Sequence, residues 1–122
     1  MDLSTDKEAW NAPSQDRIEQ TIRGLKKNEF AILGSAEQVF IQTMSLEGGY
    51  LLEKRDGGPD HHFEAIPKDG RSRVKTKPPW WVFWEKPNSI HYFTSDEIIE
   101  AFNGYLEGDP DPTFATWNQI WI

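Results

Sequence analysis

Apolar residues recur at helical spacing in two segments of the chain. In the first, Ile18, Ile22 and Leu25 follow one another at intervals of four and three residues, which places them on one side of a helix. Ser14 precedes this stripe and is a favourable N-cap, because its hydroxyl accepts a hydrogen bond from an amide of the first turn. The pattern predicts an amphipathic helix that begins near Ser14 and ends within residues 24–28.

A second helix is predicted by a stronger local signal. Thr94 and Glu97 have the spacing of a capping box, in which each side chain binds the backbone N–H of the other residue. Ile98, Phe102 and Leu106 then repeat every four residues and form an apolar stripe. The pattern predicts an amphipathic helix that extends to Leu106.

Short apolar or alternating runs, separated by turns rich in Gly, Pro and Asp, predict strands. The links between these runs are short, which favours antiparallel pairing. We therefore expect an α+β domain, in which an antiparallel sheet of about five to seven strands carries two amphipathic helices on one face in a two-layer arrangement. The predicted strands cover residues 30–33, 38–44, 50–54, 61–66, 71–77, 80–84 and 90–93.

The length of 122 residues predicts a single domain, 1–122. Residues 1–12 are mostly polar and are expected to be a loose N-terminal lead-in. Residues 109–122 begin with an acidic, proline-rich link and continue with aromatic and aliphatic residues. We expect this C-terminal tail to dock on the core.

The cysteine content and the distribution of apolar residues bear on the cellular location of the protein. The chain has no cysteine, which excludes disulfide scaffolds and thiolate chemistry. It has no apolar stretch approaching the roughly 20 residues that cross a bilayer, and residues 1–6 lack the basic and apolar regions of a secretory signal. A cytoplasmic location is expected.

Charge is spread unevenly along the chain. The 13 basic and 20 acidic residues give a net charge of −7, and residues 87–122 contain acids but neither lysine nor arginine. This balance argues against a general nucleic-acid binder, whose affinity rests on neutralised phosphates. Two interpretations stay open: an acidic surface that favours solubility, or one that steers a basic partner.

One basic segment departs from this acidity. We call it the basic ribbon; it comprises Arg71, Arg73, Lys75 and Lys77. With Trp80, Trp81 and Trp84 close behind, it is compatible with a site for single-stranded nucleic acid. The favoured alternative is an edge strand whose cations prevent aggregation, followed by a buried aromatic strand.

No residue pattern predicts catalysis. His61 and His62 are adjacent, so a strand sends their side chains to opposite faces and they cannot easily share one metal ion. His62 and Glu64 do share a face, and His91 could approach them from another strand, but histidines at the surface or in hydrogen bonds are the favoured interpretation. Asp96 and Glu100 lie in the opening turns of a predicted helix, where acids favour the helix dipole. Motifs for a serine nucleophile or a phosphate-binding loop are absent. We expect no enzymatic activity, no metal and no cofactor.

Several of these features occur together in one known kind of protein. They are the helix that follows Asn11-Ala12-Pro13, the Gly48-Gly49 turn, the hairpin at 55–60, the capped helix 94–106 with Phe102 and Tyr105, Gly108, the acidic proline link and Trp117. The chain resembles the small α+β immunity proteins of bacterial polymorphic toxin systems. It is most similar to the first-described immunity family, whose partners are often deaminase or nuclease toxins.

The resemblance implies a protein without catalytic activity that binds a cognate toxin domain one-to-one and blocks its active site or substrate groove. Toxins that act on nucleic acid commonly have a basic groove, which suits the acidic balance of this chain. Membrane association and direct nucleic-acid binding are not expected. From exposed charge and aromatic character, the predicted partner-binding residues are Glu47, Asp56, Asp60, Glu64, Trp80, Asp96, Glu100, Asp109 and Asp111.

Two other functional classes remain open at this point. An acidic chain can mimic nucleic acid and inhibit a host or phage-defence enzyme. A small module can also bind single-stranded nucleic acid through the basic ribbon at 71–77.

Overall fold

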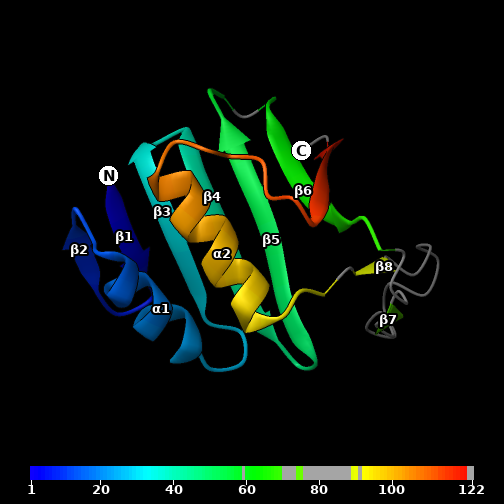
Figure 1. The fold of residues 1–122 in the computed structure, drawn as a ribbon, viewed down its shortest axis with the longest axis horizontal. Coiled ribbons are helices and arrows are strands. Elements are labelled where there is room, and N and C mark those ends of the chain that lie inside the picture. Colours follow the sequence, from blue (N-terminus) through cyan, green and yellow to red (C-terminus); the bar gives the residue numbers. More distant parts are fainter. Residues whose placement is uncertain (59, 70–73, 76–88, 91, 121–122) are drawn as a thin grey trace, which may run out of the picture.

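The computed structural model describes residues 1–58, 60–69, 74–75, 89–90 and 92–120. Seven strands form one antiparallel sheet in the order β2-β1-β3-β4-β5-β6-β9, and β7 pairs with β8 (Figure 1). The prediction of an α+β domain with an antiparallel sheet is confirmed. The elements are β1 (Asp2–Thr5), β2 (Ala9–Asn11), α1 (Gln15–Arg23), β3 (Phe30–Ala36), β4 (Val39–Leu46), β5 (Gly49–Asp56), β6 (His62–Pro67), β7 (Val74–Lys75), β8 (Ser89–Ile90), α2 (Ser95–Leu106) and β9 (Ala115–Ile120).

The four central strands agree with the sequence pattern. The predicted strands at 30–33, 38–44, 50–54 and 61–66 correspond to β3, β4, β5 and β6, with bounds that differ by a few residues. Of the predicted strand at 71–77, the structure describes the backbone of Val74 and Lys75, which form β7. The predicted strand at 80–84 lies outside the described residues.

The prediction for residues 1–12 was wrong. This segment is not a loose lead-in, because β1 pairs with β3 and β2 pairs with β1 at one edge of the sheet. Leu3 is fully buried in the core. The carboxylate of Asp6 accepts a hydrogen bond from the backbone N–H of Phe30 at 3.0 Å, which ties the β1–β2 turn to the start of β3.

The C-terminal tail docks as a strand. Strand β9 forms the other edge of the sheet and pairs with β6 over six residue pairs, from His62–Ile120 to Pro67–Ala115. Ala115 is buried, and Trp117 packs against the core. The sequence predicted the docking but not its strand geometry.

Both helices begin with the caps that the sequence predicted. The Ser14 hydroxyl accepts a hydrogen bond from the backbone N–H of Arg17. The capping box of α2 is complete, with both reciprocal bonds between Thr94 and Glu97 present. Local polar groups therefore fix where each helix starts, before any long-range contact is considered.

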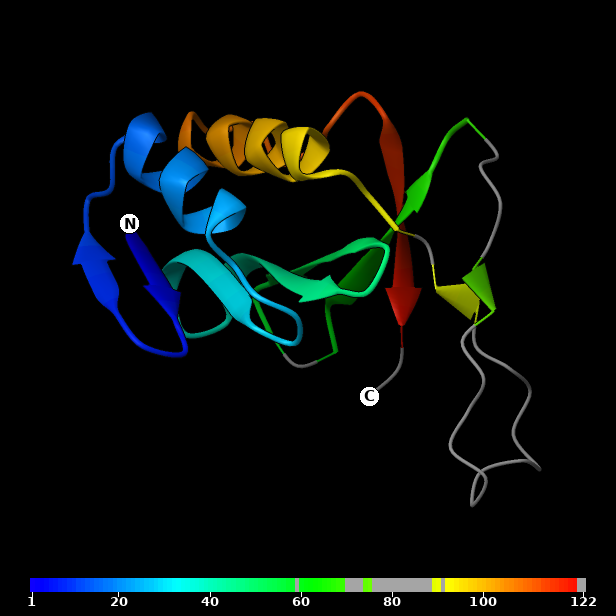
Figure 2. The ribbon, with the colours of Figure 1, turned by 90° about the horizontal axis from the view of Figure 1, so that it is seen from below.

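The core lies between the helices and the sheet. Figure 2 shows α1 and α2 on the same side of the strands, and the two helices contact each other while α2 contacts β4 and β5. Among the helices that the structure describes, none has the length and apolar character needed to cross a membrane. The largest fully buried side chains are those of Leu3, Ile18, Ile22, Leu33, Ile41, Phe93, Ile98 and Phe102.

Candidate functional site

The side of the sheet turned away from the helices carries a row of apolar side chains. We call the outward-facing side of β3, β4, β5 and β6 the open face. Successive residues of a strand point to opposite sides, so the residues between the buried Ala31, Leu33 and Ile41 face outward. Strand register places Phe30 beside Met44 and Met44 beside Leu51 on this face.

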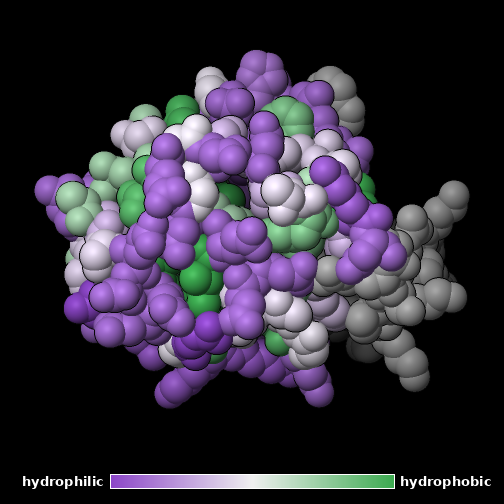
Figure 3. Space-filling view, viewed as in Figure 1, coloured by the Kyte–Doolittle hydropathy of each residue, from purple (hydrophilic) through white to green (hydrophobic). Residues whose placement is uncertain are grey.

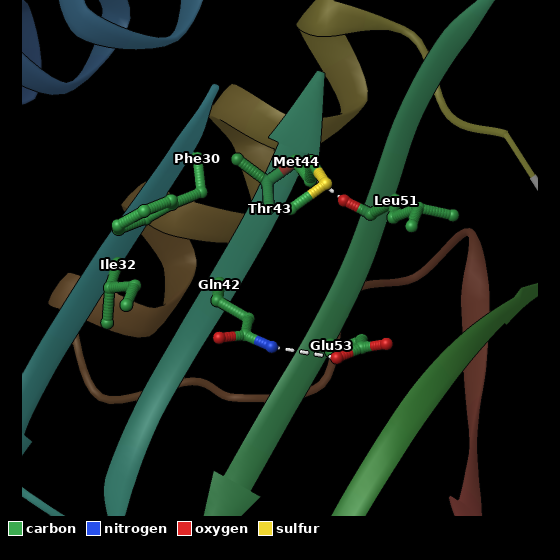
Figure 4. A pocket seen from close by; sticks show the side chains of 7 residues that line it. All are labelled: Phe30, Ile32, Gln42, Thr43, Met44, Leu51 and Glu53. Atoms are coloured by element: carbon green, nitrogen blue, oxygen red, sulfur yellow. Dashed lines mark hydrogen bonds between the residues drawn. The ribbon is translucent and has the colours of Figure 1, made fainter. Parts of the chain in front are cut away.

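These residues surround a shallow hollow of about 280 Å³. Figure 4 shows Phe30, Ile32 and Met44 around it, with the helices behind the strands. Met44 is 36% exposed, so its side chain is accessible from solvent within this patch. Polar groups close the hollow at one end, where the amide of Gln42 donates to the Glu53 carboxylate at 2.7 Å.

A buried histidine supports that carboxylate. His62 of β6 is only 4% exposed, and its Nε2 atom lies 2.8 Å from Oε2 of Glu53. The Nε atom of Arg55 donates to Nδ1 of His62 at 3.3 Å. Because an arginine is always a donor, Nδ1 must accept, and the proton of the neutral imidazole is therefore on Nε2. His62 thus donates to Glu53.

Arg55 is held on two further sides. Its Nη1 atom donates to the side-chain oxygen of Gln38 at 3.1 Å, and its guanidinium lies 5.7 Å from the centre of the Phe40 ring. The chain of contacts from Gln38 through Arg55 and His62 to Glu53 fixes the position of each group. The open face thus presents a preorganised polar cluster beside an apolar hollow.

The helix side has a different surface. Figure 3 shows it covered mainly by hydrophilic residues, with apolar side chains visible in the recess between them. On that side, exposed acids such as Glu100 point into solvent. Two hollows of similar size lie elsewhere, one of about 240 Å³ beside Tyr105 and Pro110 and one of about 290 Å³ beside Trp10 and Arg17. The open face differs from them in the polar cluster that borders its hollow.

The predicted acidic residues do not gather on one surface. Glu47 and Asp96 lie toward one end of the sheet, where the turn before β5 meets the start of α2 through the Tyr50–Phe93 backbone pair. Glu47 pairs with Lys27 at 3.3 Å, and Asp96 pairs with Arg23 of α1. Both carboxylates are thus partly neutralised within the chain.

A second group of acids lies at the opposite end. Burial raises the pKa of the Tyr105 hydroxyl, and the negative charge of nearby Asp56 raises it further. Asp109 accepts a hydrogen bond from the backbone of Asp111, which in turn lies 3.8 Å from the ammonium of Lys54. The backbone oxygen of Asp60 accepts from the side chain of Gln119 in β9.

Three residues of the predicted set remain, two of which the structure describes. Glu100 is exposed on α2, Glu64 lies on the open face of β6, and Trp80 is outside the described residues. Of the described members of the predicted set, Glu64 alone belongs to the open face. The set remains a prediction of partner-binding residues, and its described members are spread over both ends of the sheet, α2 and the open face.

Sequence reasoning did not single out Glu53 or Arg55 as site residues, and it weighed His62 only as a metal ligand. The three meet through the register of β5 and β6, in which Glu53 faces Glu64 and Arg55 faces His62. One signal was available: Phe40 and Gln42 alternate with the buried residues of β4, which indicated a second, partly exposed face.

The described residues hold no metal-binding cluster of three or more His, Asp or Glu side chains. Comparison of the chain with protein-family models, with curated proteins and with solved structures finds no match. The functional argument therefore rests on the geometry of the open face and on the charge of the chain.

Proposed function

We propose that this protein is a cytoplasmic immunity protein without catalytic activity, which binds a cognate bacterial toxin domain one-to-one. In this proposal the two helices and the sheet form two layers, and the open face is the docking surface. The bound protein covers the active site or the substrate groove of the toxin. The proposal extends the sequence resemblance with a specific surface.

The observation that carries the proposal is the apolar hollow on the open face. Partly exposed Phe30, Ile32, Met44 and Leu51 meet in one patch that borders an ordered polar cluster. Protein interfaces commonly have an apolar centre with polar groups around it, and large side chains in the centre supply most of the binding energy. The strands of the sheet hold these side chains in place side by side.

Charge supports a basic partner. The chain carries a net charge of −7, from 13 basic and 20 acidic residues. A surface with this balance accelerates encounter with a basic groove, such as one that binds nucleic acid in a deaminase or nuclease toxin.

Co-expression with a toxin tests the proposal. A pull-down from the native host first identifies the toxin domain that the chain retains. That domain is then induced in bacteria with and without the chain, and the purified pair is examined by light scattering after gel filtration. We expect growth to be restored and a one-to-one complex to form. Continued growth arrest together with separate elution of the two proteins would refute the proposal.

A further inference from the structure

Two acidic residues of the open face occupy opposite positions on neighbouring strands. Glu53 of β5 and Glu64 of β6 are direct partners in the antiparallel register. Like charges directly opposite on neighbouring strands destabilise a sheet. We therefore expect the two charges to disfavour the isolated fold, and Glu53 also lines the hollow.

Both carboxylates are held by neutral donors. Glu53 accepts from Gln42 and from the neutral His62, and Glu64 accepts from the side-chain amide of Asn118 at 3.2 Å. Neither Glu53 nor Glu64 forms an ion pair with a lysine or arginine of the described ranges. The nearby Arg55 is engaged by His62, Gln38 and Phe40 instead.

The hollow supplies the other half of a binding site. Glu53 lines it together with Phe30, Ile32, Met44 and Leu51. An arginine side chain has an apolar stem that packs on apolar surface and a planar guanidinium that binds carboxylates with two parallel bonds. A stem laid across the hollow would bring its guanidinium to Glu53 and Glu64.

We propose that the hollow and the Glu53–Glu64 pair form a subsite for one arginine side chain of the toxin domain, a proposal that rests on the proposed function. The arginine relieves the repulsion between the two carboxylates when the complex forms. The His62–Arg55 contacts keep Glu53 aimed at the incoming guanidinium. The same pair is thus unfavourable in the free protein and favourable in the complex.

Substitution E64Q separates these two effects. Glutamine keeps an oxygen that accepts from Asn118 but removes the charge. In the free protein we expect E64Q to unfold at a higher urea concentration than the wild type. Added salt should raise the urea midpoint of the wild type more than that of E64Q, because salt screens the repulsion that the substitution removes. Control E8Q makes the same charge change on an exposed residue between β1 and β2.

Calorimetry with the toxin domain then measures binding. We expect E64Q to weaken binding at least tenfold, whereas E8Q binds within about twofold of the wild type. Each arginine of the toxin domain is then replaced by alanine, and the binding of each toxin variant to the wild type and to E64Q is measured. One of these alanine variants should weaken binding to the wild type but cause no further loss of affinity for E64Q.

The outcomes distinguish the two proposals. Absence of wild-type binding would overturn the proposed function and the subsite with it. Tight wild-type binding that E64Q leaves unchanged would overturn the subsite alone. A loss of binding in E64Q without any coupled arginine would also overturn it, because the subsite requires that residue.

Discussion

The ammonium of Lys54 lies 4.7 Å from the centre of the Trp117 ring, although their strands β5 and β9 are separated by β6. The same ammonium lies 5.3 Å from the ring of Phe63 and 3.8 Å from the carboxylate of Asp111. Lys54 is 9% exposed, so the two rings and the carboxylate provide most of its surroundings. This cluster joins three strands and the link before β9.

Replacement of Trp117 by alanine should therefore loosen the edge of the sheet. The substitution removes the cation–π contact and leaves a space beside a buried lysine, which together cost about 2–3 kcal/mol. Urea unfolding measures the loss. Asp111→Asn is the matched comparison, and its cost should be below about 1 kcal/mol because that carboxylate is 74% exposed. Equal losses in the two variants would contradict this account of the cluster.

The apolar stripe of α2 should contribute unequally along its length. Ile98 and Phe102 are fully buried, whereas Leu106 is only partly buried. Phe102→Ala should lower the free energy of unfolding by about 3–5 kcal/mol, since it leaves a cavity in the core. Leu106→Ala should cost less than half as much. Similar losses for the two variants, measured by thermal or urea unfolding, would show that the helix packs differently.

A side chain at position 49 has no room. A β-carbon on Gly49 would lie 2.7 Å from Cβ of Tyr92 and 3.0 Å from the backbone oxygen of Phe93. Gly49→Ala should therefore push the 92–93 segment away from β5 and destabilise the protein by about 1–3 kcal/mol. Gly58→Ala is the control, because a β-carbon there meets nothing within 4 Å. Unfolding curves in which both variants match the wild type would disprove the close approach.

Glu29 should stabilise the fold in a pH-dependent way. Its Oε1 atom accepts from the backbone N–H of Lys26 at 2.6 Å, and its Oε2 atom pairs with Lys7 at 3.0 Å. The backbone hydrogen bond first, and then Lys7, hold the pKa of this carboxyl below its ordinary value of 4.5. A lowered pKa in the folded state stabilises the protein above the unfolded-state pKa, and the benefit disappears as the pH falls through the folded-state pKa.

Glu29→Gln should thus be less stable than the wild type at pH 7. The difference should shrink as the pH is lowered through the acid range and vanish once the wild-type carboxyl is protonated. Urea midpoints at a series of pH values provide the measurement. A difference that stays constant with pH would mean that the charge of Glu29 does not matter.

Local signals made much of the fold predictable. The caps at Ser14 and Thr94 and the four-residue spacing behind them act within a few residues, so the sequence alone indicates both helices. Runs such as Phe30-Ala31-Ile32-Leu33 likewise indicate strands, because their apolar character does not depend on a partner.

Elements that depend on distant partners were less predictable. Strand β1 is short and polar apart from Leu3, and it becomes a strand because β3 offers an edge for pairing. Strand β9 has no clear alternation, and its geometry comes from β6. The site has the same origin: Glu53 meets His62 and Glu64 through strand register, which no local pattern specifies.

The central claim is that the open face binds the toxin domain, and one calorimetric comparison tests it most directly. Met44→Arg adds a bulky cation to the exposed centre of the hollow, and Gln20→Arg makes the same charge change on the exposed surface of α1. Our account predicts that Met44→Arg weakens binding of the toxin domain at least a hundredfold, while Gln20→Arg leaves the affinity within about threefold of the wild type. Tight binding by a folded Met44→Arg variant would contradict the claim.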